Sequence, residues 1–187
     1  MKIGVIPIGI VDESVLLRIG ECLEQVFPDA KYFVIDDNLP LRRNTFDEKR
    51  RQYNSHAILS EVQAYAIKKV GLHSVLGVVD ADIFVPELNF VFGEATCPGK
   101  AALISLWRLK PEFYGEAPDR ELFLDRAVKE AVHEVGHTLG LRHCSRQSCV
   151  MHFSNSISDT DVKQSALCDR CFSNAKIGIN RLGKCHG

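Results

Sequence analysis

Residues 133–143 read HEVGHTLGLRH, and three histidines stand in this stretch at positions i, i+4 and i+10. On an α-helix, His133 and His137 lie one turn apart on the same face, so both imidazoles can reach one metal ion. Gly140 is the residue best able to adopt a left-handed conformation and end that helix, after which the chain can bring His143 to the same ion. Three neutral imidazoles leave the fourth position of a tetrahedral zinc ion open to water. The stretch therefore predicts a catalytic zinc site.

The acidic residue in this stretch, Glu134, directly follows the first predicted ligand. Zinc lowers the pKa of a bound water towards neutrality, and Glu134 is placed to take the proton of that water. The alternative interpretation is a pair of surface histidines on an ordinary helix, since HExxH alone is only a moderate signal. The glycine and the third histidine at fixed spacing remove most accidental matches.

Length and composition are those of one globular domain. The chain has 187 residues, of which 45% are hydrophobic and 25% charged, and its net charge is -1. These values argue against a broad nucleic-acid or membrane footprint, and no apolar run approaches the length of a membrane span. The apolar run over 2–10 has one lysine and is followed by Asp12 and Glu13, which indicates a buried strand and not a signal peptide. We therefore expect a cytoplasmic protein.

Hydrophobic periodicity predicts alternating strands and helices before the motif. Strands are expected over 2–10, 31–35 and 74–80, and helices over 13–27 and 55–70, with a polar, arginine-rich connection over 36–54. This alternation is typical of an α/β fold with a largely parallel sheet. Two further runs, 89–95 and 101–109, are so close together that they predict an antiparallel pair, and hence an antiparallel edge strand.

A third long helix, over 120–139, carries the motif. Its apolar stripe comprises Leu124, Val128, Ala131, Val135 and Leu139. This stripe anchors the helix in the core and leaves the histidines on an adjacent face. Regular periodicity ends at Gly140, so we expect one domain over 1–187, with an N-terminal subdomain over 1–140, a small cysteine-rich C-terminal subdomain over 141–187, and the active-site cleft between them.

Cysteines gather after the third histidine. Of the seven in the chain, four follow the motif as two close pairs: Cys144, Cys149, Cys168 and Cys171. In a reducing compartment such a set is more often a metal site than a disulfide framework, and four thiolates form a closed, structural type of zinc site. The alternative is a set of ordinary buried or redox-active cysteines. Cys22 and Cys97 are expected to be unliganded, and Cys185 and His186 to be exposed.

Met151 lies eight residues after the third histidine. A methionine in an apolar context is usually core filling, but a turn at this position could place its thioether beneath the imidazoles without ligating the metal. The eleven-residue motif followed by such a methionine turn is the signature of the metzincin peptidases. His152 is interpreted as a residue outside the metal shell.

Taken together, these residues resemble the archaemetzincin family. The resemblance covers about 39 residues and rests on the following positions: His133, Glu134, His137, Gly140, His143, Cys144, Cys149, Met151, Cys168 and Cys171. Looser likenesses lie over 51–53 and 89–93. One departure is that 16 residues separate Met151 from Cys168, where the family pattern has one more.

The resemblance implies a mixed α/β fold with an active-site cleft and two zinc ions per chain. The catalytic zinc would bind His133, His137 and His143, with Glu134 as general base, and the structural zinc would bind the four cysteines. It also implies that an edge strand on the cleft rim binds an extended peptide by strand addition, for which the run over 89–95 is the first choice.

The function predicted from the sequence is zinc-dependent hydrolysis of peptide bonds, with a peptide or protein as substrate. The first alternative is a zinc-stabilised binding module that captures peptides or proteins with little or no turnover. A weaker alternative treats the cysteine cluster as a nucleic-acid-binding module. The absence of a concentrated basic patch argues against it, although Arg142, Arg146 and Arg170 are nearby in the sequence.

Overall fold

The apolar run at the start of the chain forms β1 (Lys2–Ile8), the second strand of a five-stranded sheet with the order β2-β1-β5-β8-β7. The computed structural model describes residues 1–184, and the predictions for Cys185 and His186 lie outside them. The other strands of this sheet are β2 (Lys31–Val34), β5 (Ser74–Val79), β8 (Ala101–Ser105) and β7 (Gly93–Ala95). All neighbours are parallel except β7, which runs antiparallel to β8 at one edge. The mixed sheet with an antiparallel edge strand is confirmed.

Alternate side chains of the central strands enter two separate cores. On β5, Leu76 and Val78 face one core, whereas Val75 and Val79 face the other. Because both faces of the sheet are covered, every residue of β5 is buried, and the strand is apolar after its first residue, Ser74.

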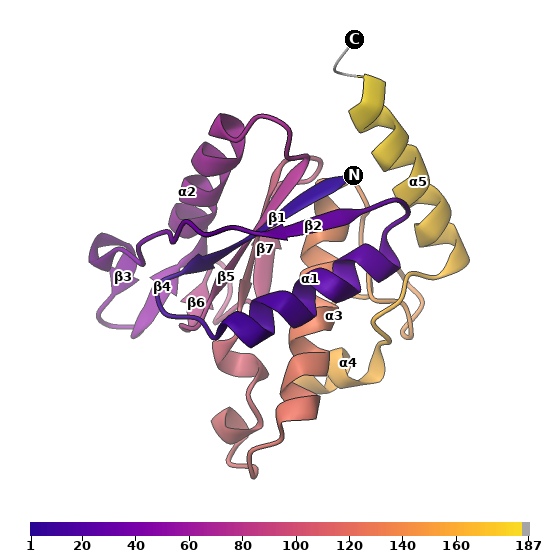
Figure 1. The fold of residues 1–187 in the computed structure, drawn as a ribbon. Helices are drawn as coiled ribbons and strands as arrows, with labels where there is room; N and C mark the ends of the chain where they lie inside the picture. Colours follow the sequence, from indigo (N-terminus) through magenta and orange to yellow (C-terminus); the bar gives the residue numbers. More distant parts are fainter. Residues whose placement is uncertain (185–187) are drawn as a thin grey trace.

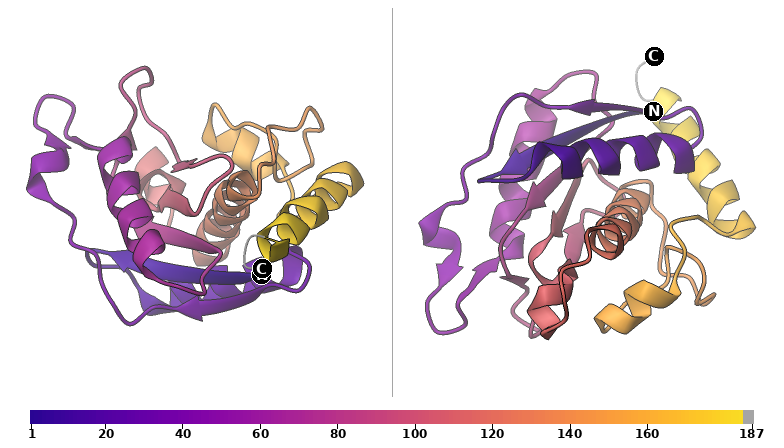
Figure 2. Two further views of the ribbon diagram at one scale, coloured as in Figure 1. Left: turned by 90° about the horizontal axis from the view of Figure 1, so that it is seen from above. Right: turned by 60° about the horizontal axis from the view of Figure 1, so that its bottom comes forward.

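Helices cover the two faces unequally. α1 (Glu13–Val26) and α3 (Arg120–Thr138) pack on one face, and α2 (Ser55–Lys68) packs on the other (Figure 1). The side chains of Asp12, Asn54 and Asp119 cap the starts of these three helices. α3 lies between the sheet and the C-terminal segment that contains α4 (Ile157–Val162) and α5 (Asp169–Lys184) (Figure 2). The motif helix is therefore buried on both sides.

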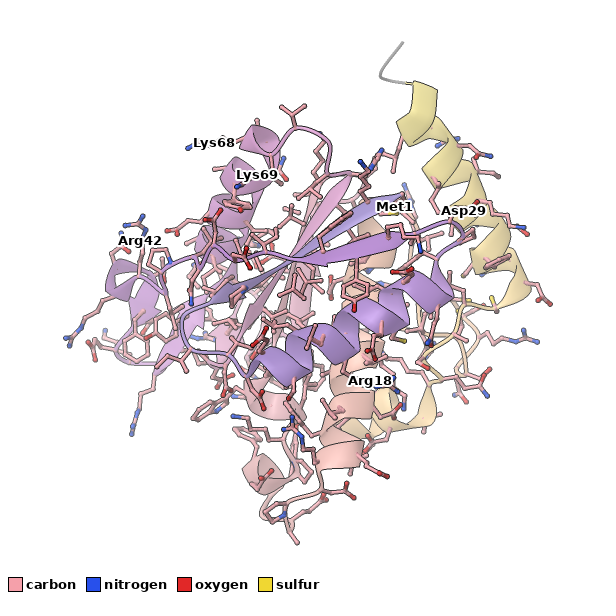
Figure 3. The ribbon with its side chains drawn as sticks, viewed as in Figure 1. Met1, Arg18, Asp29, Arg42, Lys68 and Lys69 are labelled. Atoms are coloured by element: carbon pink, nitrogen blue, oxygen red, sulfur yellow. The ribbon has the colours of Figure 1, made fainter. Side chains whose placement is uncertain are left out.

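The start of the chain is fixed beside the turn before β2. The amino group of Met1 donates to the carbonyl oxygen of Asp29 at 2.7 Å, and the amide of Lys31 donates to the carbonyl of Met1 at 2.8 Å (Figure 3). These bonds extend the β1–β2 pairing to its end. No helix in the described part of the chain is long and apolar enough to cross a membrane.

Several local expectations differ from the structure. The connection over 36–54 contains β3 (Phe46–Asp47) and β4 (Gln52–Asn54), which form a three-stranded sheet with β6 (Ile83–Phe84). The run over 89–95 is a strand only at Gly93–Ala95. Its preceding part is held by side-chain hydrogen bonds and by single backbone bonds, from the Val91 amide to Ile83 of β6 and from the Ser105 amide of β8 to Phe92, and not by a continuous ladder. The run over 101–109 leaves the sheet after Ser105 and continues as 3₁₀ turns. Helices α4 and α5 were not foreseen.

Candidate active site and cysteine cluster

The three histidines of the motif meet at one point. His133 and His137 lie one turn apart on α3, and their Nε2 atoms are 3.1 Å apart. Gly140 has φ +84°, the left-handed conformation that ends the helix and redirects the chain. The ring of His143 then lies with its centroid 5.3 Å from that of His133 and 4.9 Å from that of His137. One ligating nitrogen from each ring falls within a 4.8 Å cluster.

Hydrogen bonds to the backbone determine which nitrogen each helical histidine presents. Nδ1 of His133 lies 2.8 Å from the carbonyl oxygen of Val150, and Nδ1 of His137 lies 2.7 Å from that of Leu141. A carbonyl only accepts, so Nδ1 carries the proton and each Nε2 directs a lone pair into the cluster. Two facing lone pairs repel each other unless a cation lies between them. This donor set fits a zinc ion.

Burial keeps the histidines in the neutral form that a metal requires. Desolvation holds the pKa of His133 well below its usual range, and the nearby Lys163 ammonium and His137 add to this effect. Burial also lowers the pKa of His137 and of His143. Neutral imidazoles are therefore available as ligands at and below neutral pH.

Glu134 lies beside the histidines, 6% exposed, on the wall of the cleft. Burial and the neighbouring Glu130 and Glu94 carboxylates raise the pKa of Glu134 well above its usual range, while Lys163 opposes the rise. Gly93 on β7 makes room for this side chain, because a Cβ there would stand 2.6 Å from Cγ of Glu134. The edge strand and the acidic side chain are thus in direct contact.

The cleft in front of the histidines has a volume of about 670 Å³. One side is formed by residues 88–95, which end in the edge strand β7. The opposite side is formed by Arg142 and by residues 153–155 of the C-terminal segment. A groove bounded by a free strand edge can accept an extended peptide.

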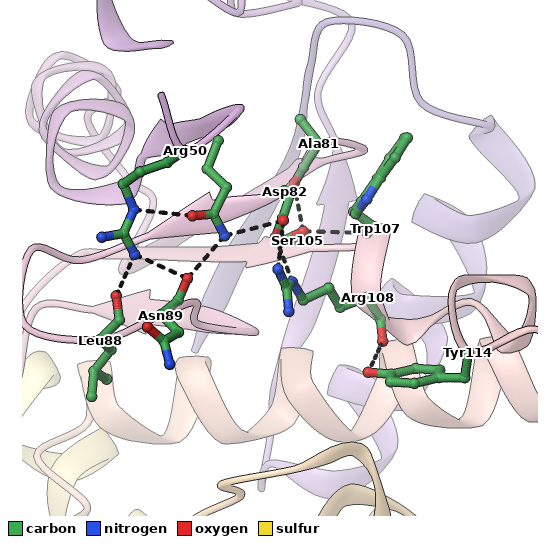
Figure 4. Close-up of polar contacts among 10 residues, drawn as sticks. Arg50, Ala81, Asp82, Leu88, Asn89, Ser105, Trp107, Arg108 and Tyr114 are labelled. Atoms are coloured by element: carbon green, nitrogen blue, oxygen red, sulfur yellow. Dashed lines mark hydrogen bonds and ion pairs between the residues drawn. The ribbon is translucent and has the colours of Figure 1, made fainter. Parts of the chain in front are cut away.

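A polar network holds the rim of this cleft from outside (Figure 4). Arg50 donates to the carbonyl oxygens of Leu88 at 2.6 Å and Asn89 at 3.0 Å. The Gln52 amide donates to the same Asn89 carbonyl at 2.9 Å and to Asp82 at 3.1 Å. Arg108 binds both oxygens of Asp82, at 2.7 and 2.8 Å. This network therefore joins the two segments with the looser family resemblance, residues 51–53 and 89–93.

A buried ion pair lies behind the histidines. Nζ of Lys163 is 2.8 Å from Oε1 of Glu130, at an angle that gives an ion pair without a well-directed hydrogen bond. Both side chains are almost inaccessible, at 0% and 4% exposed. The Thr160 hydroxyl donates to the same carboxylate oxygen at 3.0 Å. The pair joins the end of α4 to α3, one turn before His133.

The four cysteines after the motif also lie together. Their sulfur atoms fall within 4.8 Å of one another, and those of Cys144 and Cys168 are 3.9 Å apart, much farther than a disulfide bond. A hydrogen bond from the backbone of Cys171 and others from neighbouring thiols lower the pKa of Cys168 to about 7. Burial raises the pKa of Cys149 and of Cys171. Four converging thiols fit a closed tetrahedral zinc site.

Met151 is fully buried and packs against Gly136 of α3. A Cβ at Gly136 would stand 2.5 Å from its sulfur, so the glycine between the two helical histidines allows this close approach. The carbonyl of Met151 accepts from the amide of Cys144 at 2.8 Å. Nδ1 of His152 lies 2.9 Å from the Cys144 carbonyl, so this ring supports the cysteine backbone and does not join the histidine cluster.

Cys22 and Cys97 lie outside both clusters. The sequence did not reveal the parts played by Gly93, Arg50, Glu130 and Lys163. Glu130 precedes His133 by three residues, a helical spacing that could have placed it near the site. The other three come from distant segments, and no local pattern marks them.

A mixed sheet above a buried HExxHxxGxxH helix defines a metzincin-like zinc metallopeptidase. The metalloproteinase-II of Bacteroides fragilis shares this fold with a TM-score of 0.58 at 14% identity, over 95% of this chain and 52% of that one. Residues 39–177 match the model of Peptidase family M54, and the chain belongs to this family of zinc metallopeptidases.

Individual relatives agree with that assignment. An archaemetzincin of Pyrococcus abyssi is 42% identical over 95% of both chains, and one of Methanocaldococcus jannaschii is 43% identical over 91% of this chain and 90% of its own. The archaemetzincin structure from Archaeoglobus fulgidus, described as a complex with malonate, has a TM-score of 0.78 at 38% identity, over 93% of this chain and 99% of that one. The archaemetzincin structure from Methanopyrus kandleri has a TM-score of 0.83 at 33% identity, over 97% of this chain and 96% of that one. The resemblance to this family is confirmed.

Proposed function

We propose that the chain hydrolyses peptide bonds at a zinc ion held by His133, His137 and His143, with Glu134 as general base. The observation that carries the proposal is the convergence of lone pairs from these histidines beside a buried carboxylate in the cleft. When bound there, zinc supplies Lewis acidity that lowers the pKa of water and polarises a carbonyl.

Glu134 performs the proton transfers in this proposal. Its carboxylate takes the proton of the attacking water and passes it to the leaving amine. Its buried position raises the pKa, so it is a stronger base than an exposed glutamate and still releases the proton to an amine. Contact with Gly93 fixes the carboxylate at the edge of β7, where the scissile bond would lie.

The free edge of β7 is the proposed substrate-binding strand. In the described part of the chain it pairs only with β8, so its outer backbone groups can pair with an extended peptide. The lining of the cleft by residues 88–95 and 153–155 supports the proposed division into subdomains over 1–140 and 141–187, which stays a prediction.

A second zinc ion is proposed at Cys144, Cys149, Cys168 and Cys171. The proximity of their four sulfurs supports this assignment. The ion would supply folding free energy to a segment whose regular structure before α5 is limited to the six residues of α4.

The test is Glu134→Gln, which keeps the size of the side chain and removes the base. Hydrolysis of a peptide library by the zinc-loaded protein should fall at least about a thousandfold. Zinc content and peptide binding should remain. Full turnover in the variant would remove Glu134 as the base, and binding without cleavage by the wild type would favour the alternative of a peptide-binding module.

A further inference from the structure

A second cavity, of about 440 Å³, lies between the end of α3 and α5. Arg142 and His143 line both this cavity and the active-site cleft, so the two hollows adjoin at the third histidine. The remaining polar wall comes from α5, through Arg170, Asn174 and Arg181. Its position beside the proposed zinc site makes this cavity accessible to a peptide that extends beyond the cleft.

The charge in this cavity is of one sign. Three arginines line it, and no aspartate or glutamate does. Arg170 donates to Sγ of Cys144 at 3.5 Å, so it already has an electron-rich partner. Arg142 and Arg181 form no side-chain hydrogen bond or ion pair with any side chain that the structure describes.

Two carboxylates of the cleft differ in this respect, and only the third, that of the proposed base Glu134, has no hydrogen-bond or ion-pair partner among the described residues. Glu94 accepts from Ser55 at 2.5 Å and pairs with His56 at 2.9 Å, and Glu130 pairs with Lys163. These negative charges therefore have partners within the protein. Among the charged side chains that line the second cavity, the two guanidinium groups of Arg142 and Arg181 are therefore the ones without a partner in the described part of the chain.

Close packing gives both arginines a fixed backbone. A Cβ at Gly178 would stand 2.6 Å from the carbonyl oxygen of Leu139, so α5 crosses the end of α3 in backbone contact. Arg181 follows three residues later on α5, and Arg142 follows Gly140 at the end of α3. A guanidinium offers paired donors that match a carboxylate.

We propose that Arg142 and Arg181 form a subsite for an acidic side chain of the peptide substrate. The inference rests on the proposed peptidase function and names a substrate class for it. A peptide is favoured over a nucleic acid because the cavity opens beside His143 in a cleft bounded by a free strand edge.

The test compares glutamate with glutamine at each position of a fluorogenic peptide library on zinc-loaded protein. We expect wild type to favour glutamate about tenfold in kcat/KM at one position. Arg181→Glu should abolish that preference and favour lysine there, and Arg142→Gln should reduce it. Arg146→Glu is the matched control, because this exposed arginine lies nearby, lines neither cavity and gives the same change of net charge.

Fluorescence anisotropy on Glu134→Gln separates this inference from the proposed function, since binding needs no turnover. A glutamate preference that is lost in Glu134→Gln/Arg181→Glu supports the subsite even if no peptide is cleaved. Two results overturn the subsite. One is equal binding of the glutamate and glutamine peptides, and the other is a loss of the glutamate preference in Glu134→Gln/Arg146→Glu as large as that in Glu134→Gln/Arg181→Glu. The subsite is also overturned if binding of a single-stranded oligonucleotide depends on Arg181 while binding of the acidic peptide does not.

Discussion

At the scale of single residues, the site depends on which nitrogen of each imidazole is free. The carbonyls of Val150 and Leu141 hold the protons of His133 and His137 on Nδ1. Both Nε2 lone pairs therefore point at one location before any metal binds, which reduces the reorganisation that binding requires.

The pH dependence of zinc retention follows from the same residues. Burial lowers the pKa of each of the three histidines from 6.5. A depressed pKa means that the folded protein takes up these protons only below pH 6.5, so stability and metal binding are lost as the pH falls through the lowered values. We expect half-release of the histidine-site zinc below pH 6.5. The zinc content per chain after dialysis at each pH measures this release, with His137→Ala as the blank. Half-release above pH 6.5 would contradict the expectation.

At the scale of elements, residues 88–92 form a cleft wall that neighbouring strands hold only through single backbone hydrogen bonds at Val91 and Phe92. Arg50 holds two of its carbonyl oxygens and stacks over Phe84 at 4.2 Å. Arg50→Gln should raise KM by several-fold to about tenfold with a smaller change in kcat, because binding must then order the wall. Arg50→Lys should recover only part of the loss, since an ammonium lacks the planar fork.

Steady-state kinetics and hydrogen exchange over 88–92 measure this effect of Arg50. The control is Arg43→Gln, which removes another arginine of the same connection whose side chain is 91% exposed. A loss of kcat at constant KM in Arg50→Gln would show that the wall does not act through substrate binding.

The buried pair of Lys163 and Glu130 joins α4 to α3. Lys163→Met leaves an uncompensated buried carboxylate and should cost about 3–5 kcal/mol of unfolding free energy. Lys163→Met/Glu130→Gln should recover most of this loss, because the amide oxygen still accepts from Thr160. Urea unfolding of both variants measures the difference. A double variant no more stable than the single one would mean that packing of the lysine stem, and not charge, joins the helices.

At the scale of the whole molecule, the two clusters share one peptide bond, between His143 and Cys144. Cys168→Ser should therefore lose the cysteine-site zinc, lower stability, and weaken zinc binding at the histidines, because the direction from which His143 approaches depends on the cysteine cluster. Cys22→Ala, in α1, is the control and should keep both ions. Metal analysis and zinc titration measure the two sites. Unchanged histidine-site affinity in Cys168→Ser would show that the sites are independent.

Much of the fold follows from local patterns. The strands of the five-stranded sheet and the helices up to α3 are visible because apolar residues recur at helical or strand spacing, and the mixed sheet follows from their order. The short strands β3, β4 and β6 were missed, because two or three residues are too few to show a period. α4 was missed because its six residues are too few to show a period. α5 does carry a helical pattern, in Cys171, Ala175, Ile179 and Leu182, but the cysteine-rich segment around it was interpreted without regular structure. The wall over 89–92 was interpreted as strand, since a side chain such as Arg50 that replaces backbone pairing leaves no periodic signal.

The sequence by itself determined the candidate zinc ligands, the candidate general base, the cysteine cluster and the α/β class, because these depend on residue type and short spacing. Only the tertiary structure decided which neighbours tune them. Gly93 faces Glu134 from another strand, Lys163 lies behind His133, and Arg181 lines the same cavity as Arg142. Such pairs are far apart in the chain, and they meet only because packing of the sheet and the C-terminal segment around α3 brings their elements together.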